Sequence, residues 1–256
     1  MRTTLMRALT SMTLAVAVVL PAAAQPAAAV DIGTIYSWVQ KAYGLYKQFS
    51  GGGGLSIGEA TTKIIAEIDQ ARTDILAHVD QVAVADARAC TRAAVIDFAD
   101  IERFTPDTLQ AYARDATACV TLIDSRLSAV TDKASLDQLG FALAAIGPVS
   151  LVARSRAGFS TAGLVATLRT ANTAVVAKLE PPAHYDPEPI PGGYYQLGIT
   201  AVAYNGYESY VGLSGYFRAP FPSLSTFPTQ VALVKDGASA TISRSTSQAA
   251  LPLLPA

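Results

Sequence analysis

The sequence is poor in the residue types from which most catalytic and metal sites are built. Its 256 residues include only two histidines, two cysteines and one tryptophan. It contains no phosphate-binding loop, dinucleotide fingerprint, calcium loop or metalloprotease helix. Cys90 and Cys119 are 29 residues apart with no histidine beside them, a spacing that matches no zinc site. The sequence therefore predicts no cofactor and no metal, and it does not favour an enzyme.

The sequence also lacks an excess of positive charge. The chain is 51% hydrophobic and 15% charged, with a net charge of −1, which is typical of a globular protein. Without Arg2 and Arg7 of the leader segment, the 19 basic residues fall to 17 against 20 acidic ones, a net charge of −3. This balance does not favour nucleic acid or an anionic membrane surface as a partner.

The N-terminal apolar run is too short to span a membrane. It extends from Leu14 to Leu20, whereas a spanning helix needs about 20 residues. Residues 1–29 instead have the pattern of a signal peptide, in which Arg2 and Arg7 precede the apolar run and alanine-rich cleavage sites follow it. We expect a secreted or extracellular protein. The alternative is an uncleaved membrane anchor.

Two runs of apolar residues at helical spacing predict two long helices folded back on each other. The first run extends from Ile57 to Ile101 and the second from Leu109 to Val130. Thr105-Pro106 between them is typical of a helix start. A single helix of 57–101 is long enough for a local break around residues 80–86.

The two cysteines lie at matching heights on this predicted hairpin. Cys90 is fifteen residues before Thr105 and Cys119 fourteen after it, which places both roughly 22 Å from the turn. In an oxidising compartment two facing thiols form a disulfide, and we predict one between Cys90 and Cys119. The alternatives are a metal-binding pair and a reactive thiol.

The rest of residues 30–180 also has helical periodicity and predicts a mainly antiparallel bundle. A first helix is expected over residues 31–49. The capping box at Ser135 starts a later helix, which we expect to bend at Gly147-Pro148. Ser160 is placed to cap the last helix of the bundle.

Beyond residue 180 the sequence changes in character. Residues 181–193 contain five prolines and two glycines and predict a linker. Residues 194–245 predict a small β module of two hairpins, with turns at Asn205-Gly206 and Asp236-Gly237, and residues 246–256 a flexible tail. The expected fold class is therefore α+β: an N-terminal helical bundle with a long helical hairpin, then a small antiparallel sheet of two hairpins.

Tyrosines are concentrated in the predicted β module. On strands, alternate residues share a face, and exposed tyrosines can stack on sugars or dock a protein partner. The alternative is that tyrosine simply suits half-buried strands. The candidate binding residues are Tyr194, Tyr195, Tyr204, Tyr207, Tyr210 and Tyr216.

The sequence leaves three functions open. The preferred one is an exported, non-catalytic protein that binds an extracellular or cell-envelope ligand, either polysaccharide or protein. A second is a membrane-active helical protein that exposes the nearly charge-free segment 138–168; buried core helices would give the same pattern. A third is a hydrolase with a site at the bundle–sheet junction around His184, Asp186 and Tyr194.

Overall fold

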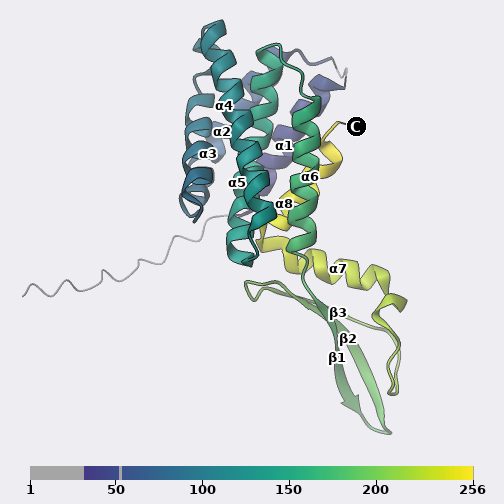
Figure 1. The fold of residues 1–256 in the computed structure, drawn as a ribbon. Coiled ribbons are helices and arrows are strands. Elements are labelled where there is room, and N and C mark those ends of the chain that lie inside the picture. The colour runs from purple at the N-terminus through teal and green to yellow at the C-terminus, as the bar shows by residue number, and fades with distance from the viewer. Residues whose placement is uncertain (1–31, 52–53, 256) are drawn as a thin grey trace, which may run out of the picture.

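A computed structural model describes residues 32–51 and 54–255, so the predicted signal peptide (1–29) lies outside the described residues. The fold is α+β, as predicted: a mostly helical N-terminal part is followed by an antiparallel sheet and two C-terminal helices (Figure 1). In chain order the elements are α1 (Ile32–Ser50), α2 (Ile57–Asp80), α3 (Ala85–Phe98), α4 (Pro106–Ala129), α5 (Lys133–Arg156), α6 (Ala162–Lys178), β1 (Ala183–Ile190), β2 (Tyr194–Val202), β3 (Glu208–Gly212), α7 (Pro228–Ala238) and α8 (Ser243–Ala250).

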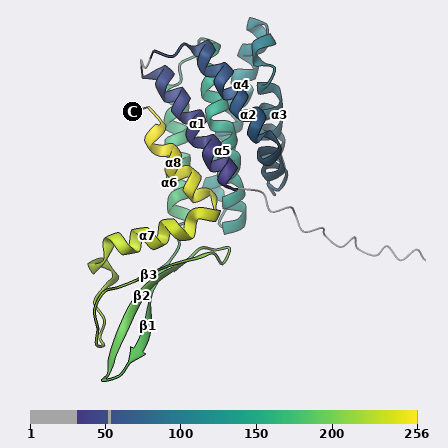
Figure 2. The same cartoon turned by 180° about the vertical axis from the view of Figure 1, so that it is seen from behind.

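Helix α5 is the centre of the bundle. Six helices contact it, namely α1, α2, α3, α4, α6 and α8, and they surround it in Figures 1 and 2. Every residue from Leu139 to Ala153 is buried. This enclosure explains why residues 138–153 carry no charge on any side of the helix. Within the described residues, α5 is the one helix long and apolar enough to cross a membrane, by length and composition only.

The ends of α5 and α6 differ in part from the prediction. The cap of α5 is Asp132, whose carboxylate accepts the backbone N–H of Ser135 at 2.8 Å. The predicted start at Ser135 was wrong because a carboxylate one turn earlier caps equally well and adds a turn of helix. Pro148 lies inside α5, which continues to Arg156. Helix α6 begins after Thr161, one residue later than Ser160 would have placed it.

Gly147 lets α1 approach α5 closely. A Cβ at this position would overlap the hydroxyl of Tyr43, which is fully buried, and would lie 3.1 Å from Leu168 Cδ2. The missing side chain of Gly147 therefore provides the space for the tyrosine ring.

Replacing Gly147 by alanine is expected to lower the free energy of unfolding by about 1–3 kcal/mol, because the new methyl group overpacks a closed core. Urea unfolding followed by the fluorescence of Trp38 measures this loss. Gly44→Ala is the matched control: it lies in α1, its Cβ would meet nothing within 4 Å, and we expect a gain of about 0.5–1 kcal/mol. Equal stabilities of the two variants would contradict the close approach of Tyr43.

The helical stretch predicted over 57–101 is divided within residues 80–86, where a local break was expected, but the two parts are antiparallel helices, α2 and α3, rather than one long rod. Thr62 near the start of α2 donates to Glu102 just after α3 at 2.8 Å, so the chain has folded back. In the turn at 81–84, a backbone N–H donates to the side chain of Gln138 at 2.9 Å. The apolar spacing was misleading because one stripe can be buried equally well on two shorter helices. The partner that secures the turn is 55 residues away.

The predicted disulfide between Cys90 and Cys119 is present. It joins α3 to α4, with the two Cα atoms 5.6 Å apart. The turn before α4 is also as predicted: Pro106 begins the helix, and the hydroxyl of Thr105 accepts the backbone N–H of Thr108. The disulfide therefore links the last two of three consecutive helices, α2, α3 and α4.

His78 lies in the last turn of α2, against the central helix. Its ring stacks on Phe141 of α5, with ring centroids 4.7 Å apart. Its buried Nε2 has no hydrogen-bond partner among the described residues. Burial lowers the pKa of His78 below 6.5, and the carboxylate of Asp74 offsets only part of this effect.

This lowered pKa predicts a stability that depends on pH. Between the folded pKa and about 6.5, the unfolded chain binds a proton that the folded chain does not. The stability that the folded protein gains by keeping His78 neutral is therefore fully present above about pH 6.5, and it is lost as the pH falls below that value. We expect the unfolding free energy of the wild type to fall between about pH 7 and pH 5 more steeply than that of His78→Gln. Identical slopes for the two proteins would contradict the burial of the His78 ring against Phe141.

The sheet has the strand order β1-β2-β3, and all pairs are antiparallel. The hairpin at Asn205-Gly206 joins β2 to β3 as predicted. The expected linker over 181–193 was wrong, because residues 183–190 form β1 and pair with β2. Proline is tolerated there because β1 is an edge strand, where Pro187 and Pro189 need not donate to a neighbour.

The second predicted hairpin was also wrong. Residues 228–238 form α7, which includes Asp236-Gly237, and Gly237 is needed because a Cβ would overlap the side chain of Ser209 on β3. The expected flexible tail over 246–256 instead contains most of α8 and a short 3₁₀ helix, and it packs on the bundle through buried Thr246, Ala250 and Leu254. The chain thus returns from the sheet to the bundle, which tethers the sheet at both ends.

Candidate functional site

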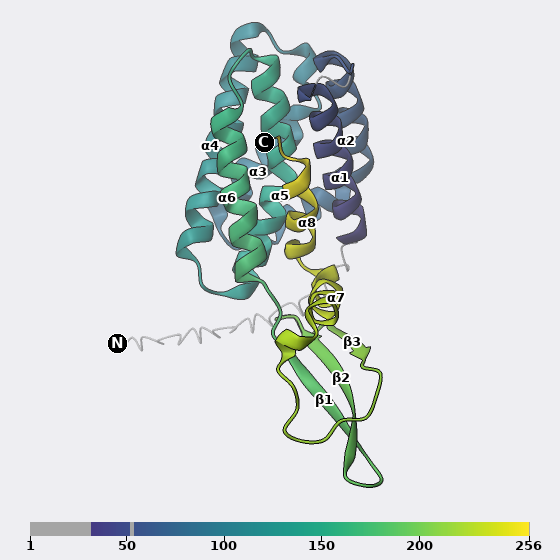
Figure 3. The same ribbon diagram turned by 90° about the vertical axis from the view of Figure 1, so that its right-hand side faces the viewer.

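The sheet projects from the bundle and has two faces of different character (Figure 3). On the inner face, Leu197, Ile199 and Ala201 pack with Val234 and Ala238 of α7. Alternate residues point to the opposite, outer face. By register this outer face consists of His184, Asp186, Glu188, Ile190, Tyr194, Gln196, Gly198, Thr200, Val202, Glu208, Tyr210 and Gly212.

Tyr210 is the centre of the outer face. Its ring crosses the middle strand over Gly198, where a Cβ would lie 2.6 Å from Tyr210 Cζ. The ring thus takes the space that a side chain at position 198 would occupy. Gly212 leaves room beside the hydroxyl, which lies 3.6 Å from where its Cβ would be. Tyr210 is nevertheless 60% exposed, so the backbone holds an aromatic ring that is open to solvent.

Polar side chains surround this ring. The register places Asp186 opposite Gly198, and it places His184 and Tyr210 on either side of Thr200. Asp186, Glu188 and Glu208 are exposed, and none of them forms an ion pair with another described residue. Carboxylates in this state can accept hydrogen bonds from a hydroxyl or an ammonium group.

A second aromatic position lies near the tip of the β1–β2 hairpin. Tyr194 pairs with Ile190 there, and the guanidinium of Arg218 lies 4.1 Å from its ring centroid. Tyr216 is 73% exposed, the highest value among the large hydrophobic residues of the described chain. Along β2, Tyr194 is four residues from Gly198, a distance of about 13 Å. The outer face therefore carries aromatic rings at its centre and at its distal end.

The other predicted tyrosines do not join this surface. Tyr195 lies on the inner face, where its ring centroid is 5.2 Å from that of Phe221. Tyr204 follows β2 and donates its hydroxyl to Asp137 of α5 at 2.7 Å. Tyr207 is 46% exposed beside the β2–β3 turn. The six tyrosines therefore do not form one continuous surface. Tyr195 faces inward, and Tyr204 and Tyr207 lie around the β2–β3 turn rather than on a strand.

Comparisons with protein-family models, with curated proteins and with solved structures find no match. The chemistry of the surface itself is therefore the basis for its function. Sequence reasoning missed Glu188, Glu208 and Gly198 as members of the outer face. The available signal was a glycine inside a strand pattern, which often marks a close approach of another group.

The residues proposed for a hydrolase are not brought together. His184 and Asp186 share the outer face, but Tyr194 pairs with Ile190, six residues further along β1. Six residues of a strand span about 20 Å, and this distance separates His184 from Tyr194. Across residues 32–51 and 54–255 there is also no group of three or more histidine, cysteine or acidic side chains placed to hold a metal ion.

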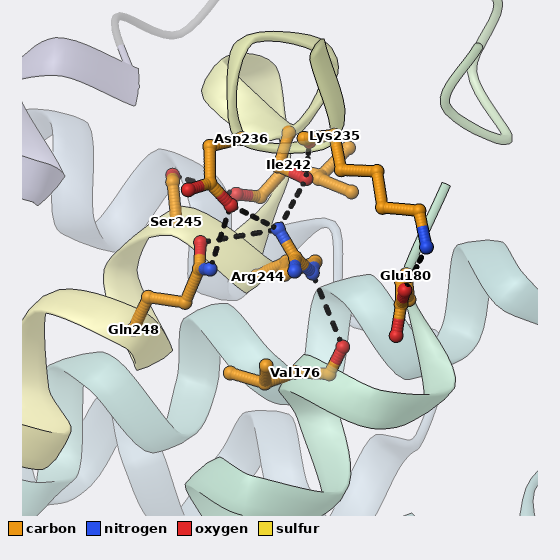
Figure 4. Close-up of polar contacts among 9 residues, drawn as sticks. Val176, Glu180, Lys235, Asp236, Ile242, Arg244, Ser245 and Gln248 are labelled. Atoms are coloured by element: carbon orange, nitrogen blue, oxygen red, sulfur yellow. Dashed lines mark hydrogen bonds and ion pairs between the residues drawn. The ribbon is translucent and has the colours of Figure 1, made fainter. Parts of the chain in front are cut away.

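A buried arginine positions the sheet module on the bundle (Figure 4). Arg244 of α8 is 6% exposed, and its guanidinium donates to Asp236 at 3.0 Å and to Ser239 at 2.9 Å. Its Nε donates to the backbone carbonyl of Val176 near the end of α6, at 3.2 Å. The side chain of Gln248 bonds both Arg244 and Asp236. One cation thus joins α6, α7 and α8.

Two further polar contacts reinforce this junction. Lys235 of α7 pairs with Glu180 just after α6 (Figure 4). On α5, the carboxylate of Asp137 accepts the backbone N–H of Ser243 at 2.6 Å in addition to the Tyr204 hydroxyl. Burial raises the pKa of Asp137, and these two hydrogen bonds partly oppose the rise. The polar groups of the junction therefore have a structural role in holding the sheet on the bundle. We assign the candidate ligand surface to the outer face of the sheet.

Proposed function

We propose that this protein is an exported, non-catalytic binding protein that uses the outer face of the sheet to hold its ligand. The observation that carries the proposal is the ring of Tyr210, held against the backbone of Gly198 and 60% exposed. Aromatic residues are enriched in binding surfaces because they bury a large area with little loss of side-chain freedom. Exposed carboxylates and the amide of Gln196 add hydrogen-bonding groups around the ring.

Binding by strand addition is not the expected mode. A ligand that pairs with an exposed strand needs a row of free backbone N–H groups. The outer edge of β1 carries Pro187 and Pro189, which have no N–H to offer. On the β1 side, the face of the sheet rather than its edge is thus the surface available to a ligand.

Retention of the full-length exported protein on insoluble cell-wall polysaccharide and envelope fractions tests the proposal. We expect the wild type to be retained and Tyr210→Ala to be released. Tyr36→Ala is the matched control, since Tyr36 is an exposed tyrosine on α1 and should not contribute. No retention of the wild type, or equal retention of all three proteins, would remove the support for binding at the outer face.

Export is supported by two observations. Residues 1–29 have the pattern of a signal peptide, and the described chain contains a disulfide, which is typical of oxidising compartments. Intact-mass measurement of the protein from the culture medium tests both points. We expect a chain that has lost its leader and carries no free thiol. A protein that stays inside the cell with residues 1–29 attached would contradict export.

A second candidate function is membrane activity, and the long apolar stretch of α5 is the observation that motivates it. Residues 138–153 of this helix carry no charge, and they could enter a bilayer if the six surrounding helices moved away. Release of a dye from liposomes, measured over several lipid compositions and pH values, tests this function. Absence of release under all these conditions would reject it and would leave the binding proposal unaffected.

A further inference from the structure

We propose that the ligand of the outer face is a linear polysaccharide that carries free amino groups. This inference rests on the proposed function and names the chemistry of its ligand. It uses three features of the outer face: the line of aromatic positions, the sign of the charge between them and the flatness of the surface.

The aromatic positions follow the middle strand. The ring of Tyr210 covers Gly198, and Tyr194 lies about 13 Å further along β2, on the same face. The exposed ring of Tyr210 can lie against the apolar face of one sugar, and the part of the Tyr194 ring that Arg218 leaves exposed can contact a second sugar of the same extended chain. Gln196 lies between the two tyrosines, where its amide can bond sugar hydroxyls.

The charge beside this line is negative. Asp186 and Glu188 run along β1 on one side, and Glu208 lies on β3 near Tyr210. All three are exposed and form no ion pair with a described residue. The register assigns no lysine or arginine to these strand positions, and the nearby Arg218 is held over the ring of Tyr194. An anionic polymer is therefore repelled, and a chain with ammonium groups is complementary in charge.

The shape of the surface favours a sugar chain over a basic peptide. Gly198 and Gly212 let the ring of Tyr210 lie across the strands at the centre of the face, so a ligand meets an exposed aromatic surface there. An extended peptide would gain most from pairing with the edge of β1, where Pro187 and Pro189 remove the donors. A flat sugar ring needs only the exposed aromatic face and nearby acceptors.

Binding of glucosamine hexamer and N-acetylglucosamine hexamer to the full-length exported protein, by titration calorimetry at mildly acidic pH, tests the inference. We expect the amino form to bind at least about tenfold more tightly, because only this form pairs with the carboxylates. The double variant Asp186→Asn/Glu188→Gln should lose this preference while still binding the acetylated form. Tyr210→Ala should weaken both ligands, and Tyr36→Ala should weaken neither.

The alternative outcomes separate this inference from the proposed function. Equal binding of both hexamers, dependent on Tyr210, would overturn the role of the amino groups and leave outer-face binding intact. Tighter binding of an oligolysine than of either hexamer, again dependent on Tyr210, would overturn the sugar in favour of a basic peptide. Binding unaffected by Tyr210→Ala would overturn both proposals. Circular dichroism of each variant shows whether a loss of binding is a loss of fold.

Discussion

Replacing Cys90 and Cys119 together by serine is expected to lower the free energy of unfolding by about 3.6 kcal/mol. The bridge spans 29 residues, and the chain-entropy relation gives this figure for a loop of that length. Without the bridge the unfolded chain regains the freedom that the closed loop removes. The folded state loses little, since Thr91 Oγ1 lies 3.6 Å from the buried Cys119 Sγ and offers the hydroxyl of a serine at position 119 a hydrogen-bond partner.

Urea unfolding of the wild type, with and without a reductant, provides the matched control for this variant. The reduced wild type should unfold at nearly the same urea concentration as the double variant, because both lack the same cross-link. A variant as stable as the oxidised wild type would contradict a structural role for the bridge. The slope of the unfolding free energy with urea should also rise in the variant, since its unfolded chain is less compact.

The disulfide was predictable because its signal is local. Thr105 and Pro106 mark the turn between α3 and α4, and counting residues from that turn brings the two cysteines to the same height. For the turn between α2 and α3, the sequence indicated a break around residues 80–86 but not a reversal of direction. Its sequence, Gln81 to Val84, contains neither glycine nor proline, and it is held by Gln138 from a distant part of the chain. A bond made only after tertiary folding cannot be seen in apolar spacing.

The same difference between local signals and distant contacts explains why one hairpin of the C-terminal half was predicted correctly and the other was not. Asn205-Gly206 gave a hairpin because the flanking residues alternate and Gly206 supplies the positive φ of 85° at the end of the turn. Asp236-Gly237 resembles it locally, but Gly237 is required for the approach of α7 to Ser209 on β3. A glycine has at least two uses, a turn or a close contact, and the sequence alone does not distinguish them.

The candidate site was predictable in composition and not in arrangement. Tyr210 and Tyr194 were among the tyrosines selected from sequence, and both lie on the outer face. Tyr195 was placed wrongly as a surface residue, because its face depends on a register that includes the unpredicted strand β1. The segment rich in proline was expected to be a linker, so Asp186 and Glu188 were not expected to flank a tyrosine ring.

Arg244 is expected to be the single most sensitive polar residue of the junction. Replacing it by alanine should lower the free energy of unfolding by about 3 kcal/mol, since it removes the donor from buried and half-buried acceptors. These include the carbonyl of Val176 and the hydroxyl of Ser239. The expected loss of unfolding free energy lies at the lower end of the range for a broken buried ion pair, because Asp236 is 57% exposed and water can replace part of its interaction with Arg244. Arg244→Lys should restore little, because one ammonium cannot reach acceptors on three helices at once.

Arg103→Ala is the matched control for this prediction. Arg103 also pairs with an aspartate at 3.0 Å, but its side chain is 85% exposed, so its removal is expected to change stability by no more than about 0.5 kcal/mol. Unfolding followed by Trp38 in the bundle and by tyrosine signals, most of them from the sheet module, should show the two transitions separating in Arg244→Ala. The reason is that Arg244 joins α6 of the bundle to α7, which packs on the sheet. An Arg244→Ala variant that unfolds in one transition with wild-type stability would show that the contacts of Asp137 and Lys235 hold the sheet without it.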